Sequence, residues 1–266
     1  MAGLHRSSVH GLSVEFSEHR PYTPGDELRH IDWKLFGRQD RYYVKEYEAE
    51  TNLKAYIFLD ASASMGYGRE GVSKLEYGSF ITASLAYLML LQRDAVGLVT
   101  MDGGGLNVIP PRSSSHHLRA LTNALENLRP SGRTDISAAL KEVAGKLHRR
   151  GLFIIISDLI DDPDGVELGI RHLHNRKNDI MVFHVADRDE LEFPFGRVTL
   201  FRDLEEDLEV TTDPREIRGE YRRAVEDHLG RVKGCCRSNN ADYDIFLTDD
   251  PLHRSLVRYL ARRGSL

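Results

Sequence analysis

Three oxygen-bearing side chains follow the first regular apolar run of the sequence. The run 55–59 ends in Asp60, and Ser62 and Ser64 follow at alternate positions before Gly66. A short apolar run bounded by turn-forming residues predicts a buried strand. Because ligands bind at the carboxyl ends of the strands in an open α/β sheet, these three side chains stand where a site would form.

Two further oxygen donors occupy equivalent places later in the chain. Thr134 lies in a loop directly before a predicted helix, and Asp158 follows the most apolar run of the sequence, 152–156. Strand ends and helix starts meet at one edge of a parallel sheet, so both are expected to join the first three. Carboxylates and hydroxyls are hard donors that suit an octahedral magnesium site, in which manganese or calcium can take the place of magnesium. The predicted metal ligands are Asp60, Ser62, Ser64, Thr134 and Asp158.

The elements that must position these residues alternate along the chain from residue 55 onward. Strands are predicted at 55–59, 96–101, 106–109, 152–156, 180–185 and 243–247. Helices are predicted at 74–92, 114–128, 136–148, 163–176, 214–235 and 252–260, the first of them covered on more than one side because apolar residues occupy most of its surface. A hairpin at 198–210 spans the acidic loop 203–207, which is interpreted as solvated. The alternation predicts an α/β fold with a doubly wound, mostly parallel sheet and helices on both faces.

Residues 1–54 are predicted to form an N-terminal arm that packs on a domain of residues 55–266, because they hold too few apolar residues for a core of their own. Val14 and Phe16 alternate as in a strand, and so do the residues of 42–47. Between these strands, Asp26 is predicted to cap a short helix whose apolar face is formed by Leu28, Ile31 and Leu35.

The segment around Trp33, the only tryptophan, has two open interpretations. Arg20, Asp26, Arg29 and Asp32 lie near Trp33 in the sequence and can form a buried ion-pair cluster with it. In the second interpretation Arg29, Asp32 and Trp33 form a docking surface for a partner.

The five predicted ligands lie within three motifs, in a fixed order. The motifs are Asp60-x-Ser62-x-Ser64, Gly132-x-Thr134-Asp135, and an apolar strand that ends in Ser157-Asp158. This order resembles the metal-ion-dependent adhesion site of von Willebrand factor A domains. The resemblance implies that Ser62, Ser64 and Thr134 bind the metal through their hydroxyls, and that Asp60 and Asp158 act mainly through water. It also implies one open coordination position for an acidic residue of a partner protein.

A longer resemblance covers about residues 11–263. The N-terminal motif reads Phe16-x-x-x-Arg20-x-Tyr22-x-Pro24-Gly25-Asp26-x-x-Arg29-x-Ile31-Asp32-Trp33, and the C-terminal one contains Asp242-Tyr243 and Thr248-Asp249-Asp250-Pro251-Leu252. Both resemble the bacterial family catalogued as domain of unknown function 58, in which the first motif precedes a von Willebrand A-like domain. The resemblance implies a MoxR-type AAA+ ATPase as partner and a role in the assembly or maturation of protein complexes.

Composition narrows the class of protein further. The net charge of -5 gives no electrostatic reason to expect nucleic acid as a partner. No apolar run reaches the length of a membrane-spanning helix, and the N-terminus lacks the apolar core of a secretory signal. The two cysteines, Cys235 and Cys236, are neighbours and are expected to be reduced thiols without an activating base. These features predict a cytoplasmic protein without membrane insertion.

Other motifs receive structural interpretations. The glycine pattern of residues 66–71 spells a dinucleotide fingerprint, but six residues separate it from its strand and the required acidic residue is missing. The histidine pairs at 116–117 and 172–174 do not share a helix face, so surface positions are expected for them. Each predicted metal ligand taken alone also fits a turn or a helix cap.

The leading hypothesis from the sequence is a non-enzymatic, metal-dependent interaction module. A metal-dependent hydrolase such as a phosphatase is the alternative, although Ser62 stands where a haloacid-dehalogenase type of phosphatase needs a second carboxylate, and no lysine follows in a phosphate-binding loop. A structural scaffold with a vestigial metal site is the third possibility.

Overall fold

The fold was analysed in a computed structural model, which describes residues 13–23, 31–39, 41–50, 53–68, 71–114, 116–146, 150–206 and 208–264. Its internal contacts divide the chain into two units, Met1–Asn52 and Leu53–Leu266. The division lies two residues before the predicted boundary between residues 54 and 55. The packing of the smaller unit on the larger one stays a prediction.

The smaller unit is built on an antiparallel strand pair, β1 (Ser13–Pro21) and β2 (Tyr43–Glu50). Both strands were expected from their alternating patterns. A shift in register between Phe16 and Glu18 interrupts the ladder.

The helix of the smaller unit begins later than the sequence suggested. Helix α1 spans Trp33–Gln39, and the buried Ile31 forms a β-bridge with Val44 instead of a helical turn. The Asp32 carboxylate accepts a hydrogen bond from the Leu35 N–H at 3.1 Å, which gives this helix its start. The prediction that Ile31 is helical is therefore wrong, and the predicted cap Asp26 lies outside the described residues.

The larger unit contains a six-stranded sheet in the order β10-β7-β6-β3-β4-β5. Its strands are β3 (Lys54–Asp60), β4 (Ala95–Asp102), β5 (Gly105–Arg112), β6 (Leu152–Ser157), β7 (Asp179–Ala186) and β10 (Asp242–Leu247). Strand β5 is antiparallel to β4, as the predicted hairpin requires, and the other pairs of this sheet are parallel. The doubly wound, mostly parallel sheet predicted from the sequence is confirmed.

Helices and a hairpin complete the larger unit. The helical segments are η2 (Ala63–Gly66), α2 (Lys74–Leu91), α3 (His117–Asn127), α4 (Ile136–Lys146), α5 (Pro163–Asn175), α6 (Arg188–Glu192), α7 (Pro214–Ser238) and α8 (Leu252–Gly264). Strands β8 (Thr199–Arg202) and β9 (Glu209–Thr212) form the hairpin. The sequence did not predict α6, because its five residues are too few for a periodic pattern. None of the helices described here is long and apolar enough to cross a membrane.

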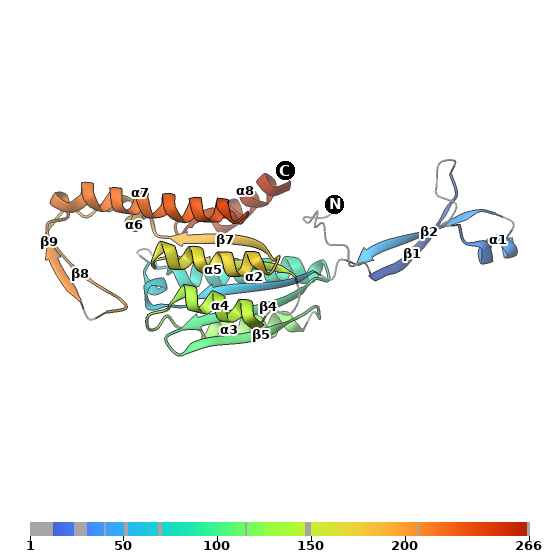
Figure 1. Cartoon of the computed structure of the whole chain (residues 1–266), viewed down its shortest axis with the longest axis horizontal. Helices are drawn as coiled ribbons and strands as arrows, with labels where there is room; N and C mark the ends of the chain where they lie inside the picture. Colours follow the sequence, from blue (N-terminus) through green and yellow to red (C-terminus); the bar gives the residue numbers. More distant parts are fainter. Residues whose placement is uncertain are drawn as a thin grey trace. The chain divides into compact units, whose positions relative to one another are not determined.

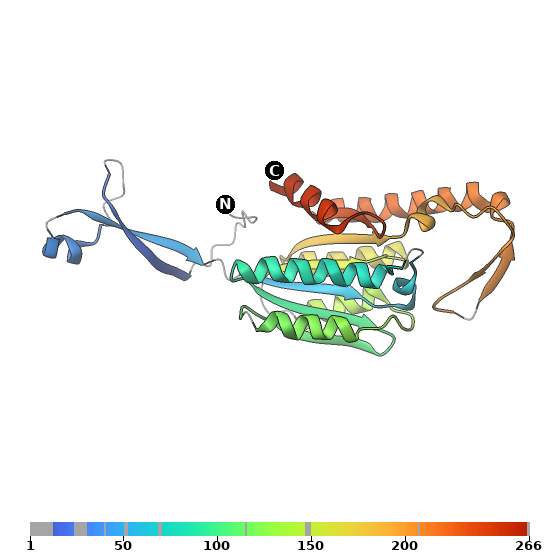
Figure 2. The same cartoon turned by 180° about the vertical axis from the view of Figure 1, so that it is seen from behind.

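Two hydrophobic cores cover the two faces of the sheet. Alternation along β3 directs Ile57 and Leu59 toward α2, α3 and α8, and Phe58 toward α4, α5 and α7. Figure 1 shows α4 and α5 over one face, and Figure 2 shows α2 and α3 over the other. Phe58 is fully buried, and burying a side chain of this size contributes about 1.5–3 kcal/mol. The buried β3 is therefore held from both faces, which fixes the position of its last residue, Asp60.

The sheet order places a crevice at a defined point. Counted along the chain, the strands of this sheet lie in the order 3-2-1-4-5-6, read from β5 to β10. After β3 the chain adds β4 and β5 on one side of β3, and then adds β6, β7 and β10 on the other side. The strand order therefore reverses between β3 and β6. In such sheets the crevice for ligands lies at the carboxyl ends of these two strands. Because β3 and β6 are paired, Asp60 at the end of β3 and Asp158 directly after β6 lie next to each other.

Helix α2 agrees with its expectation. Ile81, Leu85 and Met89 are buried on the sheet, but Phe80 and Leu91 are 53% and 63% exposed. Helix α2 packs on the sheet and also contacts α3 and α8, as a helix covered on more than one side does, while its outermost residues Phe80 and Leu91 stay exposed.

Asp94, which precedes β4, is predicted to destabilise the fold at neutral pH. It is 2% exposed, and its Oδ1 atom has no hydrogen-bond partner among the described residues. Burial raises the pKa of Asp94 to about 6, so the folded state takes up a proton that the unfolded state releases above its ordinary pKa near 4. Stability is then lost as pH rises through this window. We expect Asp94→Asn to stabilise the protein by about 1–2 kcal/mol at pH 7, and much less at pH 4, in denaturant titrations.

The exposed Asp164 serves as the control, since its side chain is 80% exposed. Asp164→Asn should change stability by less than about 0.5 kcal/mol at either pH. Equal stabilities of Asp94→Asn and the unsubstituted chain at pH 7 would contradict the prediction.

Candidate metal site

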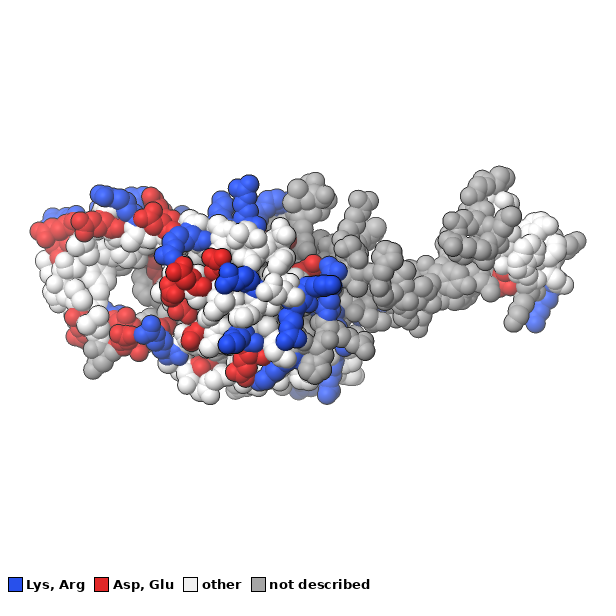
Figure 3. Space-filling model, in the orientation of Figure 1, with Lys and Arg blue, Asp and Glu red and all other residues white. Residues whose placement is uncertain are grey.

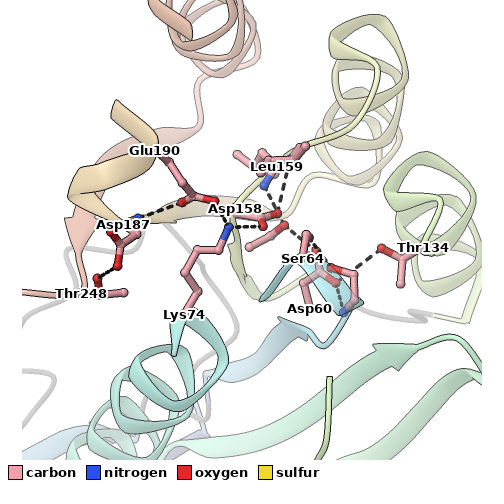
Figure 4. Close-up of polar contacts among 12 residues, drawn as sticks. Asp60, Ser64, Lys74, Thr134, Asp158, Leu159, Asp187, Glu190 and Thr248 are labelled. Atoms are coloured by element: carbon pink, nitrogen blue, oxygen red, sulfur yellow. Dashed lines mark hydrogen bonds and ion pairs between the residues drawn. The ribbon is translucent and has the colours of Figure 1, made fainter. Parts of the chain in front are cut away.

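The five predicted metal ligands lie at the carboxyl end of the sheet, around the crevice between β3 and β6. Asp60 is the last residue of β3 and Asp158 directly follows β6; they are 1% and 2% exposed. The Ser62 and Ser64 hydroxyl oxygens are 3.0 Å apart, and the Thr134 hydroxyl donates to Asp60 Oδ1 at 3.4 Å (Figure 4). Oxygen donors from three separate chain segments therefore converge as the sequence predicted.

Asp60 holds these segments together. Its Oδ1 atom accepts the Ser62 N–H at 2.9 Å, and its Oδ2 atom accepts the Ser157 hydroxyl at 2.7 Å. Burial, followed by the charge of Asp158, raises the pKa of Asp60 to about 6, although hydrogen bonds from Ser157 and Ser62 lower it. Because both oxygens already accept hydrogen bonds, this carboxylate suits a role that acts on a cation through water.

Backbone contacts between glycines fix the loop that carries Thr134. Gly132 has a φ of +64°, and a Cβ atom there would lie 2.5 Å from the Cα of Gly103. The Gly132 carbonyl accepts the Ala63 N–H at 2.9 Å, and the Ser131 N–H donates to the Ala61 carbonyl at 3.0 Å. The Thr134 loop is thus attached to the end of β3 by main-chain bonds that a larger residue at position 132 would disrupt.

Lys74 is a functional residue that the sequence reasoning missed. This first residue of α2 has no exposed surface, and its Nζ atom lies 2.7 Å from Asp158 Oδ2 and 2.5 Å from Glu190 Oε1 (Figure 4). Burial alone would lower the pKa of Lys74, but the charges of Asp158 and Glu190 outweigh burial and raise it. The lysine is therefore a fixed positive charge beside Asp158. No sequence pattern marks it, because it looks like an ordinary residue after the helix cap Ser73.

The ionic cluster extends from Lys74 to the C-terminal motif. Glu190 Oε2 accepts the Asp187 N–H, and the Thr248 hydroxyl donates to Asp187 Oδ2, both at 2.9 Å. Arg188 binds the Asp249 carboxylate through its Nε at 2.5 Å. The motif that begins at Thr248 therefore fixes α6, which carries Glu190 to the site.

The donor set fits a hard divalent cation. Two buried carboxylates stand side by side, and burial followed by the charge of Asp158 raises the pKa of Asp60; three hydroxyls lie beside them. All are oxygen ligands of the kind that magnesium and manganese prefer. Among the described residues no three His, Cys, Asp or Glu side chains gather as a metal group, so a cation here depends on the hydroxyls.

The remaining predicted residues have separate outcomes. Asp32 is buried at 9% exposure and Trp33 is 61% exposed in the smaller unit, while Arg29 lies outside the described residues. A surface position for His117 is wrong: it is buried, and its Nε2 atom lies 2.8 Å from the Val96 carbonyl. The acidic loop 203–207 is not uniformly solvated, because Glu205 is half-buried.

The cysteines carry no activated thiol. Burial raises the pKa of Cys235 to about 11 and that of Cys236 to about 12. The raised pKa values disfavour the thiolate at neutral pH, in agreement with the absence of an activating base in the nearby sequence.

The sequence pattern of one protein family matches residues 18–231, and its description is "Protein of unknown function DUF58". The chain belongs to this family. A relative of the DUF58 chain, the uncharacterized protein Rv1480 of Mycobacterium tuberculosis (strain ATCC 25618 / H37Rv), is 26% identical over 271 residues, which cover 99% of this chain and 84% of that protein.

Two solved structures resemble the fold of this DUF58 protein. The conserved hypothetical protein BatB from Bacteroides thetaiotaomicron matches with a TM-score of 0.55 and 18% identity, covering 80% of this chain and all of that chain (100%). An aerotolerance-related membrane protein from Bacteroides fragilis NCTC 9343, with multiple mutations to serines, matches with a TM-score of 0.56 over the same shares. At this identity the likeness concerns the fold, which is a doubly wound α/β sheet.

Loss of the Lys74 charge is predicted to destabilise the DUF58 protein strongly. Lys74→Met leaves Asp158 and Glu190 buried without their counter-charge, which costs about 3–5 kcal/mol. Added Mn²⁺ should recover part of this loss, because a cation at the site replaces the missing charge. Chemical denaturation with and without Mn²⁺ measures both effects.

Lys146→Met is the matched control for this substitution. Lys146 pairs with Glu142 at 2.7 Å, but both side chains are more than half exposed. Its removal should cost less than about 1 kcal/mol and should not depend on Mn²⁺. A Lys74→Met variant as stable as the control would show that the buried ion pairs are unimportant for folding.

Proposed function

We propose that this DUF58 protein is a non-enzymatic interaction module that binds a divalent cation and, through it, an acidic residue of a protein partner. The convergence of Asp60, Ser62, Ser64, Thr134 and Asp158 at the crevice of the sheet is the observation that carries the proposal. A bound magnesium or manganese ion would supply a positive charge with an open coordination position.

Each ligand has a distinct part in the proposal. Ser62, Ser64 and Thr134 would hold the cation through their hydroxyls. Asp60 would orient these hydroxyls and the bound water, since it already accepts bonds from the Ser62 N–H and the Thr134 hydroxyl. Asp158 would add negative charge, part of which Lys74 neutralises at 2.7 Å. A coordination position of the cation that the protein's own ligands leave open would accept a carboxylate from a partner.

We also propose a MoxR-type AAA+ ATPase as the partner, with a role in the assembly or maturation of protein complexes. The support is the family resemblance together with the chemistry of the site. A surface acidic residue of the ATPase would reach the cation at the crevice.

One observation bears on the alternative of a metal-dependent hydrolase. A lysine does reach the site, although from a helix and not from a phosphate-binding loop, because α2 places Lys74 beside Asp158. This ammonium is fully buried and already contacts two carboxylates, so it has no free face for a substrate phosphate. The interaction module therefore remains the better proposal.

Metal binding is tested by thermal unfolding in Mg²⁺ and Mn²⁺. A ligand that binds the folded state alone raises Tm, by an amount equivalent to about 2.7 kcal/mol at a hundredfold excess over Kd. We expect this rise for the unsubstituted chain and its loss in Asp60→Ala and Ser62→Ala. Asp164→Ala, at an exposed position, should retain it. Absence of any rise in the unsubstituted chain would sink the proposal.

Partner docking is tested with the MoxR-type ATPase of the same organism as the purified ligand. Binding should require Mg²⁺ or Mn²⁺, fail in EDTA and weaken at least tenfold in Ser62→Ala, which removes one hydroxyl without adding charge. Full binding in EDTA would place the interface elsewhere. Turnover of p-nitrophenyl phosphate that disappears in Asp60→Asn would favour the hydrolase instead.

A further inference from the structure

The β8–β9 hairpin returns to the metal site from the far side of α6. The hairpin follows α6 along the chain. In both views its loop lies toward the carboxyl end of the sheet (Figures 1 and 2). Figure 3 shows a gap between the hairpin and the body of the domain, with acidic side chains at its lower end. The loop, and not the strands of the hairpin, is the part that approaches the site.

Two neighbouring glutamates of this loop differ in their surroundings. Glu206 lies 2.6 Å from the guanidinium of Arg133, the residue directly before the predicted ligand Thr134. Glu205 is half-buried, whereas residues 202–204 and Glu206 are exposed. The ion pair therefore places the loop next to the segment that carries Thr134, and Glu205 is the less exposed of the two glutamates.

Glu205 and Ser64 line the same cavity, which has a volume of about 600 Å³. Burial raises the pKa of Glu205, and hydrogen bonds from the Ser64 hydroxyl and the Ser64 backbone lower it. Ser64 is one of the three hydroxyl ligands, so a carboxylate of the chain itself stands at the edge of the predicted site. The Ser64 hydroxyl that contacts Glu205 is the same hydroxyl that is proposed to bind the cation.

We propose that Glu205 is an internal ligand of the metal site: it takes the place of the partner's acidic residue, and the β8–β9 loop must leave before a partner can dock. This inference rests on the proposed function. The geometry that carries it is the shared cavity of Ser64 and Glu205, with the Arg133–Glu206 pair as a latch beside it.

Strand β8 of the hairpin is packed on aromatic side chains, whereas the loop is held by an exposed ion pair. Phe201 of β8 stacks on Phe193 at 5.3 Å, and Phe193 stacks on Tyr221 of α7 at 4.2 Å. The latch between Arg133 and Glu206, in contrast, joins side chains that are 67% and 57% exposed. An ion pair so exposed contributes little to stability. Residues 203–206 of the loop can therefore move while the packed strand β8 stays in place, as a releasable block requires.

The test compares the full-length Glu205→Gln and Glu209→Gln variants. Glu209 lies on β9 of the same hairpin and pairs with Arg202 across the strands, so its substitution removes the same charge away from the site. If Glu205 is an internal ligand, Glu205→Gln should weaken Mn²⁺ binding roughly tenfold in calorimetric titrations, because one carboxylate is lost. Glu209→Gln should leave the Mn²⁺ affinity unchanged.

A peptide of residues 200–210 provides the second arm, as a labelled acidic ligand in trans. With Mn²⁺ present, Glu205→Gln protein should bind it at least tenfold more tightly than the unsubstituted chain, whose site is occupied internally. The same peptide carrying Glu205→Gln should not bind, and EDTA should abolish the interaction. These results together support the internal ligand.

The failures are distinguishable. If the unsubstituted chain binds no Mn²⁺, the proposed function and this inference are both overturned. If it binds Mn²⁺ in an Asp60-dependent manner, but Glu205→Gln and Glu209→Gln have equal affinities, the metal site stands and the internal ligand is overturned.

Discussion

Two buried carboxylates side by side are the constraint on which the functional end of this protein depends. Asp60 and Asp158 end neighbouring strands of a closely packed parallel sheet, so neither can move away from the other. Their charges need compensation in a place that water barely reaches. The fold supplies part of it through Lys74 and through hydroxyl and N–H donors, and the proposed cation would supply the rest.

This constraint links distant parts of the chain. Lys74 requires Glu190 as its second partner, Glu190 is carried by α6, and α6 is held by contacts to Thr248 and Asp249 near the C-terminus. The residues of the C-terminal motif thus act on the site through positioning. The β8–β9 hairpin, which directly follows α6, is part of the same arrangement, so a change in α6 would affect both the counter-charge of Asp158 and the loop that carries Glu205.

The family match and the fold both identify the type of sheet, but neither identifies the chemistry of the residues at its crevice. The match to DUF58 covers most of the chain, and the solved relatives share the doubly wound sheet. A fold of this type serves many functions, so the residues at its crevice must decide among them. The crevice holds hard oxygen donors and a lysine whose ammonium group already contacts two carboxylates. This arrangement is the basis for proposing that a carboxylate docks there and that no group is transferred.

The sequence by itself predicted most strands and helices of the larger unit, and it predicted that Asp60, Ser62, Ser64, Thr134 and Asp158 lie at one edge of the sheet. Period and turn chemistry are local properties, and the three site motifs are short and recur in a fixed order. Local signals were less reliable in the smaller unit, where the burial of Ile31 against Val44 overrode the helical spacing. Sequence spacing failed for α6 for a different reason, because its five residues are too few to show a period.

Only the tertiary structure decided which charges meet at the site. Lys74 and Asp158 are 84 residues apart, and Lys74 and Glu190 are 116 apart, so no local pattern records their contacts. The position of Glu205 beside Ser64 likewise depends on how the hairpin returns to the sheet. The sequence predicted where the oxygen-bearing side chains lie, because each of them follows a strand or precedes a helix of the parallel sheet. The neighbouring lysine and the internal glutamate came from long-range packing, which spacing along the chain does not encode.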